Sequence, residues 1–595
     1  MTAAPTPEAG ARHGAEHVAP DCRGLNFYAI DGALRALLPL YLPPALGAHL
    51  EPHLQRLGEL AGGRLDALAE TAERHPPVLH PRDRYGRDEP WIEFHPAYHE
   101  MERIAFGEFG LHAMGHRGGV LGWPEPLPPV AKYAFQYLFT QAEFGLMCPV
   151  SLTDTAAHLL IRHGDAALRE RFVPRMLSQE RAELLRGSQF MTEKSSGSDV
   201  RDLETTARRE GDHWRLSGDK WFCSHANADV ALLLARPEGA PPGTRGLALF
   251  AMPWRLEDGT RNAYRIVRLK EKLGTRSMAS GEIVLEGALA YLVGDPRRGL
   301  KQILEQVNLS RLSHGARAAG MMRRCLNEAL RVARYRRAFG KPLVELPLQR
   351  RQLLKLLVPT EQALSVVLHT AHVAGAAGAD PAAADALRLL TPLVKLRACR
   401  DNLRVATGAM EVRGGNGYIE DWVNARLVRD AHVGVLWEGT SNIVALDAIA
   451  RAVGRHGAHE PLAEGLYERL SAAEGAPAAW RTRVKDTVTR AAAFAAQVAQ
   501  ALAERPEAEA LARQAAGSLY HAVSAALLTW EGARLGAAGG DARRLLLARL
   551  VLEHRLAPRD PLAAGEGAWE AEAGALLLDE RPVPLDAAAR LLAAE

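Results

Sequence analysis

Apolar residues recur at three- and four-residue spacing over most of this chain, a pattern that predicts helices. Before residue 187 this spacing is clearest over residues 45–75 and 132–164. The histidine- and proline-rich residues 75–96 between them are typical of a loop. Past residue 299 helical spacing returns, over residues 300–338, 346–373, 385–413 and 424–453, and an alanine-rich helical tail follows.

The spacing of apolar residues changes between residues 187 and 293. Here short runs, either alternating apolar and polar or rich in β-branched residues, are separated by Gly, Asp and Pro. The runs predicted to be strands are residues 213–224, 228–236, 246–254, 264–274 and 281–294. The chain is therefore expected to be mainly α with a central β-domain. Its expected parts are a flexible arm (1–24), an N-terminal helical domain (25–186), the β-domain (187–297), a helical bundle (298–456) and a C-terminal helical extension (457–595).

Composition adds limits to this picture. The apolar fraction of 47% is enough for large buried cores. The formal charge of +3, from 73 basic and 70 acidic residues, gives the whole molecule no preference for a polyanion. The five cysteines lie far apart without a C-x-x-C pair, which indicates a reducing compartment and argues against structural zinc. We expect a cytoplasmic protein with no metal site, no signal peptide and no membrane span.

One carboxylate stands out as a candidate catalytic base. Glu438 follows the apolar run Val433, Val435, Leu436 and Trp437 and precedes a Gly-Thr-Ser-Asn turn. An apolar environment raises the pKa of a carboxyl group, which suits a base that must hold a proton during a reaction. The alternative is a glutamate that opens a helix, where the macrodipole favours it without any catalytic role.

Two stretches at the start of the β-domain have the residue types of a ligand site. QFMTEKSSGSDV (189–200) offers small residues and hydroxyls that let the backbone approach a ligand. GDKWFCSHANAD (218–229) places two aromatic residues just before a serine, so that a flat ring can stack while a hydroxyl reaches its edge. A strand with an aromatic core residue explains the second stretch equally well.

Two further stretches, RRAFGKP (336–342) and RGGNGY (413–418), lie at helix ends. Arginine forks onto phosphate, and glycine turns let backbone amides meet a pyrophosphate. Glycine turns also simply cap helices. Because the chain contains neither G-x-G-x-x-G nor a Walker A motif, a nucleotide here would be held without a Rossmann unit.

In this order the motifs MTEKSSGSD, GDKWFCS, KLGTRSMAS, RRAFGKP, RGGNGY and WEGTSN resemble the acyl-CoA dehydrogenase family over residues 130–450. The stretches NFYAIDGAL, GRLDALAETAERHPPVL and FHPAYHEMERI are similar to the AidB branch, flavoproteins linked to the alkylation-damage response. The resemblance implies an N-terminal helical domain, a middle β-barrel and a C-terminal helical bundle, here with an added helical extension.

The resemblance also implies site roles. Glu438 matches the base that removes the α-proton of an acyl-CoA thioester while a hydride passes to flavin N5 of FAD, and its backbone amide helps to polarise the thioester. Arg311 and Trp437 match positions on the substrate side. The implied flavin contacts are Met191, Thr192, Ser198, Phe222, Cys223 and Ser224. Those implied to reach the FAD of a neighbouring subunit, or to complete that side, are Arg336, Phe339, Gly414, Gly415, Thr440 and Asn442.

The chain departs from common members of the family at three of these positions. They have tryptophan where this chain has Phe222, threonine at Ser224 and glutamine at Glu411. Some members place the base one residue before the arginine that Arg311 matches. Because this chain has Ser310 there, Glu438 is left as the candidate.

The partners implied by the resemblance are an acyl-CoA substrate, further copies of the chain in a homotetramer (a dimer of dimers), and an acceptor such as an electron-transfer flavoprotein. The alternative is an AidB-like, DNA-associated flavoprotein with secondary dehydrogenase activity. Basic residues that would meet DNA gather in the extension, although solvated helix faces or an assembly module explain them more simply. They are Arg481, Arg483, Lys485, Arg490, Arg543, Arg544, Arg549, Arg555 and Arg559.

Overall fold

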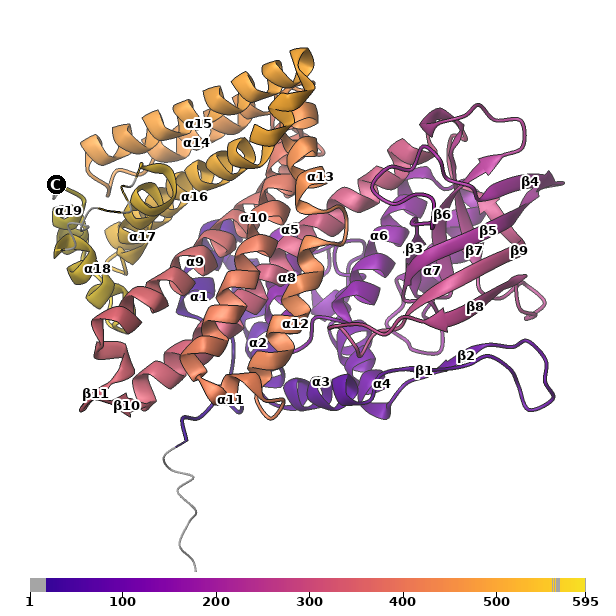
Figure 1. Ribbon diagram of the computed structural model, residues 1–595, viewed down its shortest axis with the longest axis horizontal. Coiled ribbons are helices and arrows are strands. Elements are labelled where there is room, and N and C mark those ends of the chain that lie inside the picture. The colour runs from indigo at the N-terminus through magenta and orange to yellow at the C-terminus, as the bar shows by residue number, and fades with distance from the viewer. Residues whose placement is uncertain (1–17, 559, 561, 563–567, 594–595) are drawn as a thin grey trace, which may run out of the picture.

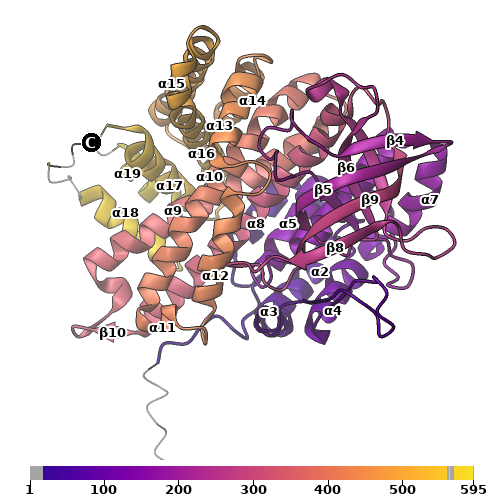
Figure 2. The same cartoon turned by 45° about the vertical axis from the view of Figure 1, so that its right-hand side comes forward.

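The computed structural model describes residues 18–558, 560, 562 and 568–593. A β-domain lies at one end, a bundle of long helices at the centre, and the extension at the other end (Figure 1). The N-terminal helices lie against the bundle and the β-domain (Figure 2). They are α1 (Gly32–Tyr41), α2 (Pro44–Gly62), α3 (Arg64–Arg74), α4 (Pro96–Glu102), α5 (Pro129–Thr140), α6 (Met147–His163) and α7 (Ala166–Met176).

Two details of this region differ from the sequence prediction. The histidine- and proline-rich stretch is not simply a loop, because β1 (Val78–His80) and β2 (Trp91–Glu93) pair in an antiparallel hairpin. The rings of His80 and Trp91 stack across it, with centroids 4.2 Å apart. A cross-strand aromatic pair of this kind stabilises a hairpin that alternation does not reveal.

The predicted arm is ordered over the part that the structure describes. Cys22 is buried, and its amide donates a hydrogen bond to the buried Glu328. The Arg413 guanidinium donates to the carbonyl of Ala19. Folded structure therefore extends before residue 25, while residues 1–17 of the arm lie outside the described residues.

The β-domain closes into a barrel. Its strands are β3 (Gly187–Phe190), β4 (Thr206–Glu210), β5 (His213–Ser224), β6 (Val230–Pro237), β7 (Ala248–Pro253), β8 (Tyr264–Leu269) and β9 (Ser280–Leu292). Because β6 pairs with both β4 and β7, the path β6–β4–β5–β9–β7 returns to β6, with β3 and β8 attached. Alternation misses β4, a mostly polar strand in which Ala207 alone is buried.

The helical bundle is built on three long helices, α8 (Gly299–Tyr335), α9 (Pro347–Ala376) and α10 (Pro381–Arg413). The hairpin of β10 (Arg337–Ala338) and β11 (Lys341–Pro342) joins the first two. After α10 come α11 (Gly415–Tyr418), α12 (Val423–Ala431), α13 (Ser441–Leu446) and the π-helical segment Asp447–Val453. The single helix expected over residues 424–453 is thus interrupted around Glu438.

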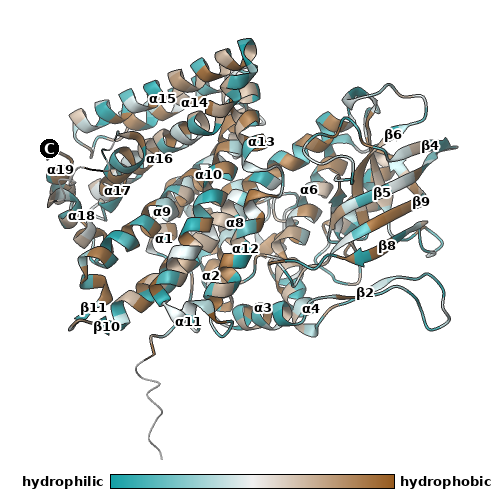
Figure 3. Ribbon diagram, viewed as in Figure 1, coloured by the Kyte–Doolittle hydropathy of each residue, from teal (hydrophilic) through white to brown (hydrophobic). Residues whose placement is uncertain are grey.

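The extension packs against α9 and α10 and shares one continuous hydrophobic core with the bundle. Teal and brown residues alternate along α15 and α16 in Figure 3, as expected for amphipathic helices. No helix of the described ranges is long and apolar enough to cross a membrane. The helices of the extension are α14 (His459–Ser471), α15 (Ala478–Glu504), α16 (Ala512–Ala537), α17 (Arg543–Val551), α18 (Ala568–Leu578) and α19 (Leu585–Ala593).

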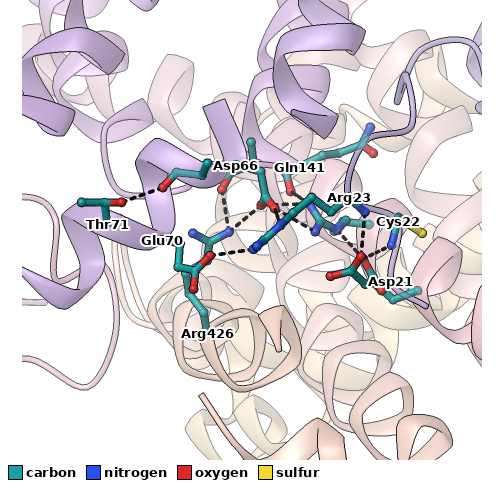
Figure 4. Close-up of polar contacts among 12 residues, drawn as sticks. Asp21, Cys22, Arg23, Asp66, Glu70, Thr71, Gln141 and Arg426 are labelled. Carbon is teal, nitrogen blue, oxygen red and sulfur yellow. Dashed lines mark hydrogen bonds and ion pairs between the residues drawn. The ribbon is translucent and has the colours of Figure 1, made fainter. Parts of the chain in front are cut away.

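A buried ion network ties the N-terminal helices to the bundle (Figure 4). Asp66 of α3 accepts hydrogen bonds from Arg324 of α8, at 3.1 Å, and from Arg426 of α12, at 3.0 Å. Arg23 lies between Asp66 and Glu70 at the edge of the network. Burial raises the pKa of Asp66, but the arginines outweigh burial, so that the pKa falls below its usual value.

Candidate functional site

Glu438 lies in a strained turn between α12 and α13. Its φ is +51°, a conformation that non-glycine residues rarely adopt, and Gly439 follows with φ +98°. Arg311 of α8 donates from Nε to the Glu438 carbonyl at 3.1 Å, and Lys395 of α10 donates to the Gly439 carbonyl. Two cationic side chains from long helices therefore fix the backbone of this turn, and such strain is often found at functional sites.

The Glu438 carboxylate faces α8. The Ser310 hydroxyl donates to Oε1 at 2.9 Å, and His314 Nε2 lies 2.6 Å from Oε2. Ser310 and His314 are four residues apart and share a helix face. Ser310 is also the position that some members of the resembled family use for the base, and the structure brings the two positions into hydrogen-bond contact.

The prediction of a raised pKa for Glu438 is wrong for this structure. Burial does raise it, but His314, Arg317 and Ser310 outweigh burial and lower the pKa to about 2. The carboxyl group is therefore ionised near neutral pH. Burial lowers the pKa of His314 to about 4, so its imidazole is neutral beside the carboxylate. The sequence interpretation considered the apolar run before Glu438 but not the polar face of α8.

Arg311 holds this turn through a second set of contacts. Its Nη1 lies 2.6 Å from Asp447, and Arg388 of α10 lies 2.6 Å from the other oxygen of the same carboxylate. The sequence interpretation did not single out Asp447 or Arg388. Their pairing depends on helices brought together by the fold, and neither lies in a recognisable motif.

Trp437 is partly buried and packs against a small cluster of Cys148, Leu152 and Met278. Its ring meets that of His314 edge-on, with centroids 5.8 Å apart. Trp437 thus separates the Glu438 turn from α6 and from the loop before β9, and it forms one wall beside the carboxylate.

The two predicted ligand stretches of the β-domain lie side by side, because the Trp221 amide donates to the Thr192 carbonyl at 2.8 Å. Phe222 is 55% exposed. Trp221 is half-buried and has the Lys270 ammonium 3.2 Å from its ring centroid. A partly open aromatic surface therefore adjoins the predicted hydroxyls. Of the remaining predicted residues here, Met191 and Ser224 are half-buried and Ser198 is exposed.

Cys223 does not fit its predicted role as a side-chain contact. It is fully buried in the core of the β-barrel, and burial raises the pKa of its thiol far above the usual value. Successive side chains of a strand point to opposite faces, so Phe222 and Cys223 cannot both face a ligand.

The residues predicted to meet a neighbouring subunit are exposed. Phe339, at the tip of the β10–β11 hairpin, is 93% exposed and has φ +51°. Arg336 has no ion pair or side-chain hydrogen bond within the described ranges. Gly414 (φ +74°) and Gly415 open α11, and a Cβ at either would meet no atom within 4 Å. The hairpin and α11 lie at the lower end of the bundle, away from the β-domain (Figure 1).

Thr440 and Asn442 belong to the Glu438 turn and are also exposed. One copy of the chain therefore brings together Glu438, Arg311 and Trp437, and gathers Thr192, Phe222 and Ser224 next to them, because Ser224 hydrogen-bonds to Cys148, against which Trp437 packs. It does not bring Arg336, Phe339 or the glycines to either group. Among the described residues no cluster of His, Cys, Asp and Glu could hold a metal ion.

Three known protein domains match successive parts of the chain and together cover most of it. Residues 18–181 match the adaptive response protein AidB N-terminal domain, residues 188–288 the acyl-CoA dehydrogenase middle domain, and residues 297–454 the acyl-CoA dehydrogenase C-terminal domain. The matched order is the order of the helical, barrel and bundle domains. No part of the extension beyond residue 454 is included in these matches.

Individual relatives agree with these matches. The chain is 34% identical to the putative acyl-CoA dehydrogenase AidB of Escherichia coli (strain K12), over 74% of this chain and 81% of that protein. It is 32% identical to acyl-CoA dehydrogenase family member 11 of Caenorhabditis elegans, over 71% of this chain and 70% of that protein. The solved structure of C. elegans ACDH-11 in complex with C11-CoA has a TM-score of 0.82 at 27% identity, and the match covers 94% of this chain and 95% of that chain.

Proposed function

Because this chain belongs to the acyl-CoA dehydrogenase family, oxidoreductases that act on CH–CH bonds, we propose that it dehydrogenates an acyl-CoA thioester with Glu438 as the base. The observation that carries the proposal is the setting of the Glu438 carboxylate. It is oriented by Ser310, sits on a strained turn held by Arg311, and is 15% exposed. A base held in one orientation removes a proton without reorganising first.

The chain's own residues account for the proton step. The low pKa of Glu438 keeps the carboxylate ionised and ready to accept the α-proton. The Glu438 amide, fixed by the contacts of Arg311 and Lys395 with the turn, would donate to the thioester carbonyl and stabilise the negative charge that develops there. Trp437 covers one side of the carboxylate and limits its contact with water.

The residue types at the candidate site fit an FAD cofactor. Phe222, Thr192 and Ser224 offer an aromatic surface and hydroxyls for a flavin ring. Away from the β-domain, Arg336, which makes no ion pair within the described residues, and the exposed Gly415 at the start of α11 offer donors for pyrophosphate, and the exposed ring of Phe339 accompanies them. Bound FAD would supply the hydride acceptor.

The test of the base is Glu438→Gln, with Glu420→Gln as a matched control on an exposed carboxylate. We expect Glu438→Gln to retain flavin but to slow anaerobic bleaching by acyl-CoA about 10²- to 10⁴-fold, the usual loss on removing a general base. Glu420→Gln should bleach at the wild-type rate. Bleaching of both variants at one rate would show that Glu438 is not the base.

We also propose that two copies of the chain share each FAD site, because the β10–β11 hairpin and α11 lie away from the β-domain of the same copy. Arg336→Glu should release flavin and weaken assembly together, since it sets a like charge against phosphate. The control is the adjacent exposed Arg337→Glu, whose guanidinium donates to the Gly340 carbonyl. Flavin content and sedimentation at low protein concentration measure both effects. A fully loaded, fully assembled Arg336→Glu protein would contradict shared sites.

DNA association is a second candidate function, favoured by the match to the AidB N-terminal domain and by exposed basic residues on α15, Arg483, Lys485 and Arg490. The second basic cluster contributes little, because Arg544 and Arg549 are buried in internal ion pairs. Arg559 lies outside the described residues. Duplex binding over a salt series, with the three α15 residues reversed to Glu, is the test. Steep salt dependence lost in the variant would support DNA binding.

A further inference from the structure

Arg317 is a buried cation next to the candidate site. It is 1% exposed and lies on the same face of α8 as Ser310 and His314, at i, i+4 and i+7 spacing. The nearby charge that acts on it is the carboxylate of Glu438. Arg317 therefore lies on the wall that continues from the Glu438 carboxylate into the protein interior.

The guanidinium of Arg317 is unusually poor in partners. Its Nε donates to the Ser313 carbonyl at a long 3.4 Å, its Nη1 has no hydrogen-bond partner, and it lies 5.4 Å from the ring centroid of Phe144. A buried charge without a counterion costs considerable free energy. Such a cost in a native protein calls for an explanation outside ordinary stability.

Comparison with the other buried arginines shows how exceptional this is. Within the described ranges, every other buried arginine has a carboxylate at ion-pair distance, and Arg317 alone has none. The paired arginines are Arg311, Arg323, Arg324, Arg413, Arg426, Arg544 and Arg549.

Glu438 does not serve as this missing partner. Arg317 lowers the pKa of Glu438 through space but makes no ion pair with it, while Ser310 donates to Oε1 of that carboxylate and His314 Nε2 lies 2.6 Å from Oε2. At least one N–H of Arg317 is therefore left for a group that the chain does not supply. An arginine fork matches a carboxylate in geometry as well as in charge.

We propose that Arg317 binds a carboxylate at the far end of the acyl group, so that the substrate is a short dicarboxylic acyl thioester. This inference rests on the proposed function. Arg317 lies three residues beyond His314, about 4.5 Å along the helix axis. An extended chain spans about 3.8 Å over three bonds, which is close to that distance. With the α-carbon beside Glu438, a five-carbon diacid places its second carboxylate near Arg317.

The test compares glutaryl-CoA with valeryl-CoA, which has the same number of acyl carbons but an apolar end. Binding is measured by calorimetry on flavin-loaded Glu438→Gln protein, which prevents turnover, with and without Arg317→Met. We expect glutaryl-CoA to bind more tightly than valeryl-CoA. Arg317→Met should reduce that preference about tenfold to hundredfold, the usual effect of losing a hydrogen bond to a charged group.

Failure of this inference is distinguishable from failure of the proposed function. If valeryl-CoA binds at least as tightly as glutaryl-CoA and Arg317→Met changes neither affinity, Arg317 does not recognise the acyl group. The proposed dehydrogenation of an acyl-CoA thioester would remain unaffected by that result. If neither thioester binds and no acyl-CoA bleaches the flavin, the proposed function falls and this inference falls with it.

A thermal measurement separates ligand recognition from a structural role. Without ligand, Arg317→Met should leave Tm unchanged or raise it, because the variant removes an unpaired buried charge. The matched control Arg324→Met breaks pairs with Asp66 and Glu328 and should lower Tm. A fall in Tm for Arg317→Met as large as for Arg324→Met would make Arg317 a structural residue and overturn the proposal.

Discussion

At the scale of single residues, the basicity of Glu438 is set by its polar neighbours. Burial raises its pKa, but contacts with His314 and Ser310, together with the charge of Arg317 acting through space, reverse the effect. A carboxylate with a pKa of about 2 is a weak base in the free protein. Its advantage is a fixed orientation, together with full ionisation over the whole range in which the protein is expected to work.

Ser310→Ala should raise the pKa of Glu438, because it removes one hydrogen bond to the ionised form. A hydrogen bond to a charged group corresponds to about one to two pKa units. The acidic limb of the pH profile for flavin reduction should therefore move to higher pH by about that amount. The control is Ser313→Ala, which removes another buried hydroxyl of α8, one that donates to Gln136 of α5. This control should leave the pH of the acidic limb unchanged.

At the scale of elements, a few buried charges position the helices. Asp66 connects α3 with α8 and α12, and Glu328 joins Arg324 to Arg413 at the end of α10. These pairs specify how helices distant in the sequence meet, because a buried carboxylate tolerates few arrangements of its partners. They also fix α8, the helix that supplies Ser310, Arg311 and His314.

Asp66→Asn should destabilise the protein strongly, since it leaves the buried Arg324 and Arg426 with too little negative charge. Breaking a buried pair on one side costs about 3–5 kcal/mol. Asp88→Asn breaks an exposed pair with Arg82 and should cost less than about 1 kcal/mol. Midpoints of urea unfolding compare the two variants. Equal midpoints would show that the Asp66 network is not important for stability.

At the scale of the whole molecule, the extension is held to the bundle by a buried carboxylate. Glu361 of α9 pairs with Arg323 of α8 and, at 2.7 Å, with Arg544 of α17. Burial raises the pKa of Glu361, but the two arginines outweigh burial and lower it to about 2. The extension is thus part of the same folded unit as the bundle.

This pair predicts an acid-sensitive attachment. A lowered folded-state pKa contributes stability above the unfolded value of 4.5, and that stability is lost as the pH falls from about 4.5 toward 2. The shift corresponds to about 3 kcal/mol. Hydrogen exchange of α17, taken relative to the intrinsic exchange rate at each pH, should therefore accelerate over this interval. Glu361→Gln should accelerate it at neutral pH, whereas the exposed Glu572→Gln should not. Unchanged exchange in Glu361→Gln would refute the anchoring role.

The sequence alone determined the order of domains and most of the elements. Hydrophobic periodicity and turn residues located the barrel strands β5 to β9 within a few residues. The motifs identified the family and predicted Glu438 as the candidate base. These features are local, because periodicity and turn chemistry depend on neighbouring residues.

Only the tertiary structure decided the environment of each site residue. It lowered the pKa of Glu438, turned Cys223 into the barrel core, and left Arg317 without a counterion. It also separated Arg336 and Phe339 from the β-domain. Burial and charge pairing depend on residues far apart in sequence, such as Ser310 and Glu438, and no local pattern records which of them meet.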